Sequence, residues 1–484
     1  MNTTLIIFVV LYLLGTLALG MWAGTRIKNT SDFAVAGRSL PLVMVITTTF
    51  ATWFGAETVM GIPAKFVQGG LNAVIEDPFG AGMCLILVGM FFAAKLYKLN
   101  LLTIGDYYRQ RYGKGIEIFC SVAIIFSYLG WVAAQITALG LVFSVLTGGA
   151  MAPATGMIVG TLTVLIYVVV GGFLAVAVTD FIQMIVLVVG MSVIAYFAAD
   201  LAGGADNVLA MAQGADLWRL WPEPGFTDIM FFIGAAVTMM FGSIPQQDVF
   251  QRVMSAKDAP TARTGAIIGG ASYILFAFVP MFIVAAAVVV MGSQAMELAQ
   301  NDYQRLLPTF VMTKMPLVMQ ILFFGALLSA IKSTSSATLL APSTSFVENI
   351  LKNFKPGMSD RQQLLAMRVT IVVFAALVLT YAIAMEGTSI YELVSGAYQV
   401  PLVGAFIPLV MGLYWKRATT QGAVLSIAAG LITWILFMEG VTGWGEHFPG
   451  QLAGLIAAFV GMVLGSLAPQ VVANSGAGHQ VVHA

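Results

Sequence analysis

The sequence contains few of the residues on which enzymes, metal centres and disulfide scaffolds depend. It has two cysteines and three histidines among 484 residues, and 9% of it is charged, against about 25% in a typical soluble domain. Cys84 and Cys120 lie in or beside apolar runs, where cysteine packs as a small hydrophobic residue, and they match no metal or disulfide motif. His447 lies in a loop, and His479 and His483 lie near the end of the chain. We therefore expect no enzymatic activity and no cofactor held by cysteine or histidine.

Hydrophobic residues make up 59% of the sequence and recur in runs of about 20 residues, the length that crosses a bilayer as a helix. The formal net charge of 0 argues against a nucleic-acid partner. The first run has no basic segment before it and no small-residue cleavage site, so we interpret it as a retained span rather than a signal peptide. The runs predict an all-α polytopic protein of the lipid bilayer with thirteen spans, at about 5–24, 42–69, 75–98, 117–147, 152–172, 175–200, 226–253, 263–292, 316–349, 365–385, 389–415, 420–438 and 448–470.

The basic residues indicate how these spans are oriented. If the N-terminus is outside, the loops on the cytoplasmic side collect most of the 22 lysines and arginines, as the positive-inside rule requires. The C-terminus is then cytoplasmic. We expect a multi-pass protein of a plasma membrane, such as a bacterial inner membrane, with a single transmembrane domain at 1–470 and a short cytoplasmic tail at 471–484.

The segment 325–350 is apolar but carries hydroxyls and a lysine. Ser329, Lys332, Ser333 and Ser336 recur at i, i+3, i+4 and i+7 and therefore share one helical face, with Thr334 beside it. Hydroxyls alone could bond to their own helix or join two helices. A lysine in the middle of a span is costly in lipid. This face is therefore expected to meet a protein-lined cavity.

Two spans are interrupted midway by helix-breaking and polar residues. The second span carries Gly55, Glu57, Gly61 and Pro63, and the seventh carries Gly242, Pro245, Gln246, Gln247 and Asp248. Secondary transporters expose backbone groups for ligands at such breaks, in the first helix of each of two inverted repeats. Spans 2–6 (about 42–200) and 7–11 (about 226–415) fit such a pair. The alternative is a pair of kinks that bind nothing.

Four motifs resemble the sodium:solute symporter family over about residues 1–470. They are ATWFGAETVMGIP at 51–63, VVVGGFLAVAVTDFIQ at 168–183, IPQQDVFQRVMSAKDA at 244–259 and LSAIKSTSSATLLAPST at 328–344. Within the family the chain is most similar to the high-affinity choline transporter branch. The resemblance implies a leucine-transporter-type core of two inverted five-helix repeats, with one helix before it and two after.

The resemblance also implies a sodium site between the second and ninth spans. Its ligands would be the carbonyls of Ala51, Phe54 and Ala330 and the hydroxyls of Ser333 and Thr334. A hard cation prefers several oxygen ligands, which an unwound turn can supply. The alternative for the two hydroxyls is helix packing.

A second ion region near the cytoplasm occurs in some family members, and here it would include Asp180 and Ser336. Ala337 stands where a further serine is expected, and Lys332 stands where the family tends to have an apolar residue. The ammonium is expected to point toward Asp180 and could take the place of the ion. Coupling to Na⁺, coupling to H⁺ and substitution by Lys332 therefore stay open, as does a Lys332–Asp180 pair that only joins two helices.

The predicted solute site combines aromatic and polar residues. Trp53, Tyr128 and Trp131 could form a wall for an amine or quaternary amine, with Glu57 as counter-charge. The alternatives are helix packing for the tryptophans and a pairing of Glu57 with Lys65.

The two glutamines suggest a more polar site than in the choline branch, because Gln246 replaces a tryptophan of that branch. Gln246 and Gln247 could bond an amide, carboxylate or hydroxyl, as in an amino-acid-like solute. We predict an ion-coupled secondary transporter of a small polar or cationic organic solute that works by alternating access. The rival is a sensor that binds the solute without moving it.

Overall fold

The computed structural model describes residues 3–438 and 441–472. Its apolar runs fold as helices because a helix satisfies its own backbone hydrogen bonds in lipid. Short turns of π- or 3₁₀-helix join several of them. The α-helices are α1 (Thr3–Gly24), α2 (Thr30–Val35), α3 (Leu42–Trp53), α4 (Ile62–Ala73), α5 (Ala81–Leu87), α6 (Ala93–Lys98), α7 (Ile104–Tyr112), α8 (Lys114–Leu146), α9 (Pro153–Leu201), α10 (Ala205–Gly214), α11 (Phe226–Gly242), α12 (Gln247–Ser255), α13 (Ala259–Met291), α14 (Ser293–Asn301), α15 (Leu306–Lys314), α16 (Leu317–Ser345), α17 (Lys352–Phe354), α18 (Asp360–Ala384), α19 (Ile390–Pro401), α20 (Ile407–Tyr414), α21 (Thr420–Leu436) and α22 (Gly450–Leu467).

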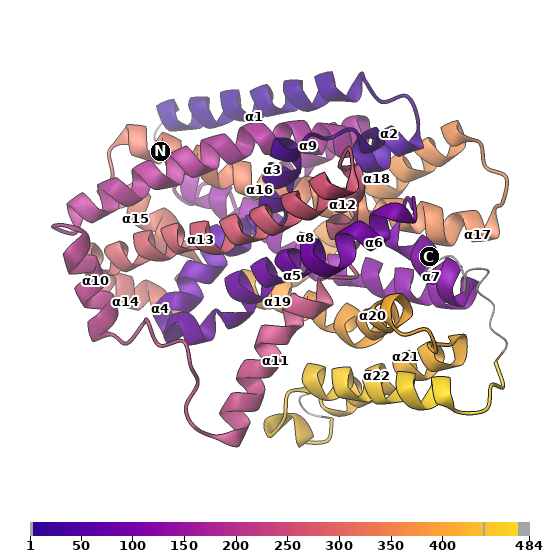
Figure 1. Ribbon diagram of the computed structural model, residues 1–484. Helices are drawn as coiled ribbons and strands as arrows, with labels where there is room; N and C mark the ends of the chain where they lie inside the picture. The colour runs from indigo at the N-terminus through magenta and orange to yellow at the C-terminus, as the bar shows by residue number, and fades with distance from the viewer. Residues whose placement is uncertain (1–2, 439–440, 473–484) are drawn as a thin grey trace.

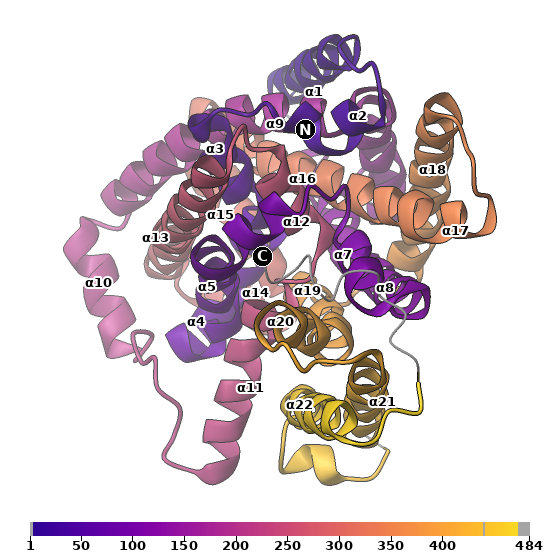
Figure 2. The ribbon, with the colours of Figure 1, turned by 45° about the vertical axis from the view of Figure 1, so that its right-hand side comes forward.

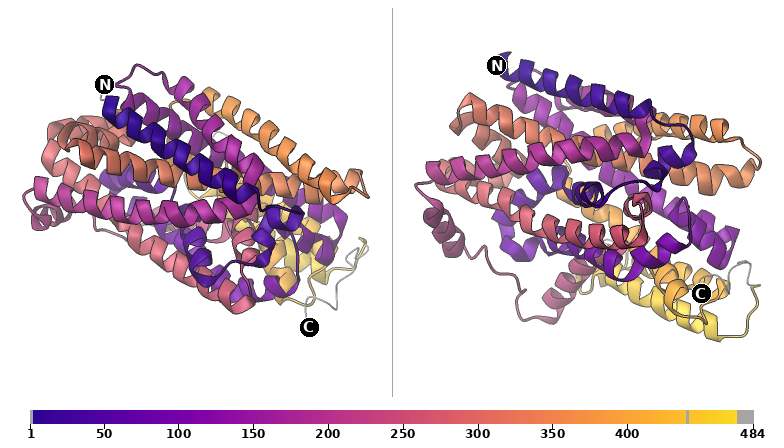
Figure 3. Two further views of the ribbon diagram at one scale, coloured as in Figure 1. Left: turned by 90° about the horizontal axis from the view of Figure 1, so that it is seen from above. Right: turned by 45° about the horizontal axis from the view of Figure 1, so that its top comes forward.

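The long helices lie side by side as a bundle, with short helices gathered at its two ends (Figure 1). Helix α1 begins at one end and α22 finishes at the other (Figure 1). Helix α1 lies along the outside of the bundle and contacts α9 and α16 (Figures 2 and 3). Helix α16, the polar segment of the sequence, lies deeper and contacts α3, α8, α9 and α12. The hydroxyl-bearing face is therefore enclosed by protein, as its cost in lipid requires.

Helix α9 contains two of the predicted spans in one helical run of 49 residues. At 1.5 Å per residue such a run would be roughly 74 Å long, more than twice the ~30 Å of a hydrocarbon core. The chain changes direction at Gly172, whose φ of +50° is in the left-handed region. The predicted boundary between 152–172 and 175–200 falls at this glycine.

By length and composition, nine helices of the described chain could cross a membrane, or eleven when each bent pair counts as one span. Helix α21 is apolar but only 17 residues long. The prediction of thirteen spans counts α21 as a span and counts the two halves of α9 as two spans. The number of spans and their orientation stay predictions, and of the predicted tail only residues 471–472 are among those described.

The two interrupted spans are bent where the sequence predicts. Leu42–Trp53 and Glu57–Ala73 meet at 55°, and Phe226–Gly242 and Gln247–Ser255 meet at 47°. Both bends are buried within the bundle, because Trp53, Phe54, Gln246 and Gln247 are each almost inaccessible to solvent. The breaks therefore expose backbone groups to protein and not to lipid.

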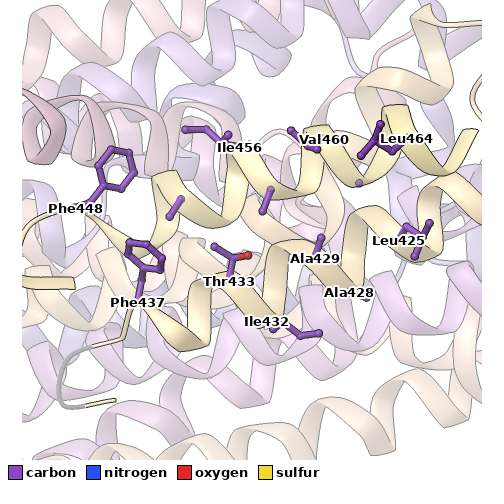
Figure 4. Close-up of a pocket in the computed structure, with 13 residues that line it drawn as sticks. Leu425, Ala428, Ala429, Ile432, Thr433, Phe437, Phe448, Ile456, Val460 and Leu464 are labelled. Atoms are coloured by element: carbon purple, nitrogen blue, oxygen red, sulfur yellow. The ribbon is translucent and has the colours of Figure 1, made fainter. Parts of the chain in front are cut away.

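A surface hollow of about 950 Å³ lies between α21 and α22 (Figure 4). Its lining is apolar apart from Thr433, and several of its side chains, such as Ile432 and Leu464, are more than half exposed. In a bilayer these side chains would meet lipid chains. No predicted site residue lines this hollow.

Candidate solute and cation sites

The break after α3 is stabilised by the side chain of Gln135 on α8. Its Oε1 accepts a hydrogen bond from the backbone N–H of Ala56 at 2.9 Å. Gly55 is required at the break, because a Cβ there would lie 2.6 Å from Glu57 Oε2 and 2.7 Å from Thr334 Oγ1. Glu57, predicted for the solute, and Thr334, predicted for the cation, therefore approach the same point of the backbone.

The Glu57 carboxylate is buried and receives two hydrogen bonds from α8. Gln135 Nε2 donates at 2.5 Å and Trp131 Nε1 donates at 3.2 Å. Among the described residues Lys65 makes no ion pair with Glu57, and its ammonium lies 5.9 Å from the centroid of the Tyr391 ring. Both donors to Glu57 are neutral, so a negative charge on it would not be balanced by the protein at this point.

Four rings from three elements meet beside Glu57, and we call them the aromatic cluster: Trp53, Tyr128, Trp131 and Tyr398. The centroids of Trp53 and Trp131 are 5.1 Å apart, and Tyr398 lies 5.7 Å from Trp53 and 5.5 Å from Trp131. Tyr128 stacks on Trp131 at 6.0 Å. All four side chains are buried. Trp131 therefore faces the protein interior, as the predicted solute site requires.

The second break contributes Gln246 and Asp248 to the same region. Gln246 Nε2 donates to Ser127 Oγ at 2.8 Å, while its Oε1 has no hydrogen-bond partner among the described residues. Asp248 bonds to the hydroxyl of Tyr128. Gln247 turns elsewhere, because its Oε1 accepts from the backbone N–H of Ile104 at the start of α7. The structure therefore gives Gln247 a role in holding α7, where the sequence suggested a contact with solute.

A small cavity of about 10 Å³, which we call the cation cavity, lies between α3, α9 and α16. Thr334, the remaining predicted cation ligand, donates to the carbonyl of Ala51 at 3.4 Å. The cavity is lined by four of the five residues predicted to bind the cation, together with five neighbours: Ala51, Phe54, Ala330 and Ser333, and Phe50, Gln183, Met184, Leu187 and Ser329.

Asp180 joins the cation cavity to α3. Its two carboxylate oxygens accept hydrogen bonds from Ser333 Oγ at 2.5 Å and from Thr48 Oγ1 at 2.6 Å. Arg252 of α12 reaches the same residue of α3, because its Nε donates to the carbonyl of Thr48 at 3.0 Å. The hydroxyl of Ser336 donates to the carbonyl of Ser333 at 2.7 Å. Asp180, Ser333 and Thr48 are thus joined by hydrogen bonds, while Ser336 bonds to its own helix, and the second ion region stays a prediction.

Lys332 does not take the expected direction toward Asp180. Its Nζ donates to Thr16 Oγ1 of α1 at 2.6 Å and lies 5.2 Å from the centroid of the Tyr167 ring. Within the described chain Lys332 forms no ion pair with Asp180. The helical wheel places Lys332 beside Ser333, but the 100° between consecutive residues directs its side chain to another neighbouring helix.

Three residues that sequence reasoning missed belong to these sites. Gln135 lies one turn beyond Trp131 on the same face of α8, and Gln183 lies one turn beyond Asp180 on α9, so their spacing could have revealed both. Tyr398 had no such signal, because nothing in its sequence neighbourhood indicates that it faces Trp53.

Comparison with known proteins identifies the family. The profile of the sodium:solute symporter family matches residues 33–430. The chain belongs to the sodium:solute symporter family. The resemblance predicted from the four motifs is thereby confirmed, and this member of the family is an ion-coupled secondary transporter of small solutes.

Among its relatives are high-affinity choline transporters. The chain is 27% identical over 450 residues to that of Caenorhabditis elegans, covering 88% of this chain and 76% of the relative, and 28% identical over 442 residues to that of Homo sapiens, covering 88% and 75%. It is also 25% identical over 483 residues to the sodium/pantothenate symporter of Haemophilus influenzae, covering 96% and 97%.

Solved transporters share the fold. A Na⁺-coupled sialic acid symporter in its substrate-bound outward-open state superposes with a TM-score of 0.84 at 21% identity, covering 98% of this chain and 100% of the other. MhsT in complex with L-phenylalanine gives 0.59 at 14% identity, covering 89% and 98%. The symporter is thus a multi-pass helical membrane protein with a known transporter fold.

Proposed function

We propose that this symporter uses sodium to take up a small organic cation, which binds between the rings of the aromatic cluster with Glu57 as its counter-charge. The observation that carries the proposal is the position of Glu57. It is a buried carboxylate beside four aromatic rings, and its hydrogen-bond donors are neutral.

Both parts of this site favour a positive ligand. A buried carboxylate is costly unless a cation or a proton balances it. The faces of tryptophan and tyrosine rings attract a cation through their quadrupoles, by about 2 kcal/mol or more when water is excluded. The choline transporters among the relatives handle a quaternary amine, which is a ligand of this kind. Tyr398 adds a fourth ring to the aromatic cluster. Gln246 adds a polar side chain to the same region.

Binding requires the rings to separate, because Trp53 and Trp131 now pack on each other. Trp53 is the last residue of α3, directly before the break, so a tilt of α3 would move its ring relative to α8. Alternating access by one repeat rocking against the other would produce such a movement.

The two sites are close enough to be coupled. Ala51 and Phe54, which line the cation cavity, flank Trp53 in the chain. A cation that fixed the backbone of 51–54 would also fix the Trp53 ring, so each ligand would raise the affinity for the other. The direction of Lys332 supports sodium over a substituting ammonium, because the Lys332 charge is held at α1.

The proposal is tested by uptake into proteoliposomes, with radiolabelled choline as the first probe and unlabelled amines, amino acids and carboxylates as competitors. We expect accumulation with an inward sodium gradient and none with potassium in its place. Glu57→Gln keeps the shape of the side chain, but it removes the negative charge and replaces one of the two accepting oxygens by an N–H donor. It should abolish uptake of the cation. The matched control is Glu223→Gln, since Glu223 is an exposed partner of Arg219. Competition by neutral or anionic solutes without competition by amines would contradict the proposal.

A further inference from the structure

Gln183 of α9 is a buried amide without hydrogen-bond partners. Its side chain is 2% exposed, and neither Oε1 nor Nε2 has a partner in the described structure. Leaving a buried polar group unpaired costs about 1–3 kcal/mol for each group, so native proteins rarely do so without a ligand or a function. Gln183 lines the cation cavity. A ligand in that cavity would satisfy it.

The size of the cavity limits what that ligand can be. A cavity of about 10 Å³ is at the lower limit for one water molecule, ~10–15 Å³ by the same measure. An organic solute is far too large for it. A small cation that has lost its water is of the right size, and Ala51, Phe54, Ala330 and Ser333 are among the residues around it. Hard cations bind several oxygens, and an amide carbonyl is a suitable ligand.

Helix α1 packs against α9 beside this amide. The hydroxyl of Tyr12 on α1 bonds to Ser329, which also lines the cavity and donates to the carbonyl of Gly325 at 2.7 Å. The same hydroxyl lies close to the Gln183 amide, although not in hydrogen-bond geometry. If the amide nitrogen faces Tyr12, the amide oxygen is free for the cavity.

We propose that Gln183 Oε1 is a further ligand of the coupling cation and that Tyr12 of α1 is a positioning residue that holds this amide. The inference rests on the sodium coupling proposed above. It adds a ligand from α9 to oxygens contributed by α3 and α16, so that cation binding joins three helices. It also gives the first helix a part in cation binding.

The test measures thermal stabilisation of the purified full-length chain against sodium concentration, at constant ionic strength with potassium as the replacement. Gln183→Met keeps the length of the side chain and removes the oxygen. We call the sodium concentration that gives half of the maximal stabilisation the sodium midpoint. We expect Gln183→Met to raise it about tenfold or more, since interactions of polar groups with charges contribute about 1.5–3 kcal/mol. Gln320→Met is the control on α16, because Gln320 bonds to backbone carbonyls of Met312 and Met315 away from the cavity. Its sodium midpoint should match the wild type.

Gln183→Glu separates a ligand from a packing residue. It keeps an oxygen and adds a charge, so it should be less stable than the wild type without sodium and have an equal or lower sodium midpoint. Tyr12→Phe should raise the midpoint by less than Gln183→Met does. Binding of radioactive sodium to the same variants provides a second readout.

The outcomes distinguish this inference from the proposed function. If the wild type is not stabilised by sodium, sodium coupling itself is wrong. If the wild type is stabilised and Gln183→Met has the same midpoint, only the role of Gln183 is overturned. A Gln183→Met variant that does not fold leaves the decision to Gln183→Glu, for which a midpoint raised above the wild type would overturn the inference.

Discussion

The Lys332 ammonium donates a hydrogen bond to the Thr16 hydroxyl at 2.6 Å, which joins the polar helix α16 to the first helix α1. Both side chains are buried, and the Tyr167 hydroxyl bonds to the carbonyl of Lys332 at 3.0 Å from α9. The sequence suggested that the Lys332 charge takes part in ion coupling. In the structure this charge lies where α1, α9 and α16 pack together. Ser333, the next residue, faces Asp180.

Lys332→Met should therefore leave the coupling ion unchanged. The Lys332 charge is bonded to a neutral hydroxyl, so replacing it by an apolar side chain of similar volume removes the cost of burying it and should be neutral or stabilising. We expect uptake to keep its sodium dependence and the melting temperature to stay equal or rise. Thr16→Val is the companion variant, because it leaves the ammonium buried without its acceptor and should destabilise the protein by about 1–3 kcal/mol. Sodium-independent uptake by the wild type, with sodium dependence appearing only in Lys332→Met, would restore the substituting-ammonium hypothesis.

The periodic and helix-breaking features of the sequence predicted most of the framework. Glycine and proline marked both bends, because these residues interrupt a helix wherever they occur. The spacing of Ser329, Ser333 and Ser336 predicted one polar face, because helical geometry alone determines which residues share it.

Side-chain partners from distant segments were not predictable in this way. Lys332 and Ser333 differ by one position, and which neighbouring helix each one meets depends on the packing of α1, α3 and α9 around α16. Tyr398 joins the aromatic cluster only because α19 packs on α8. The spacing from Asp180 could have placed Gln183 on the same face of α9, but only the cavity shows which groups surround its amide.

Replacing Ser333 and Thr334 together by alanine tests the cation cavity directly. The variant removes two of the proposed cation ligands and leaves one Asp180 oxygen without its donor. We expect the sodium midpoint of thermal stabilisation to rise by at least about tenfold, with reduced choline affinity through the coupling of the sites. Ser335→Ala is the control, because the buried Ser335 hydroxyl donates to the carbonyl of Ile331 at 2.6 Å. Equal sodium midpoints for the two variants would make Ser333 and Thr334 packing residues.

Trp131→Phe tests the link between the rings and the carboxylate. It keeps an aromatic face and removes the Nε1–H that donates to Glu57. We expect the KM for choline to rise about tenfold, because a hydrogen bond to a charged group contributes about 1.5–3 kcal/mol, while the sodium midpoint stays the same. Trp434→Phe is a matched control, since its indole donates to Gln399 at 2.9 Å on α19. A KM that changes equally in both variants would argue against a specific role for Trp131.

The last prediction concerns Gly55, where the two sites approach the same backbone point. A methyl group there would lie 2.6 Å from Glu57 Oε2, 2.7 Å from Thr334 Oγ1 and 2.9 Å from Gln135 Oε1, closer than van der Waals contact allows. Gly55→Ala must therefore displace groups of both sites, and we expect choline uptake and the sodium midpoint to be impaired together. Gly325→Ala is the control on α16, because nothing lies within 4 Å of its added methyl group. That change should stabilise the helix by about 0.5–1 kcal/mol and leave transport intact. If Gly55→Ala impaired choline binding and left sodium binding unchanged, the two sites would not share this part of the backbone.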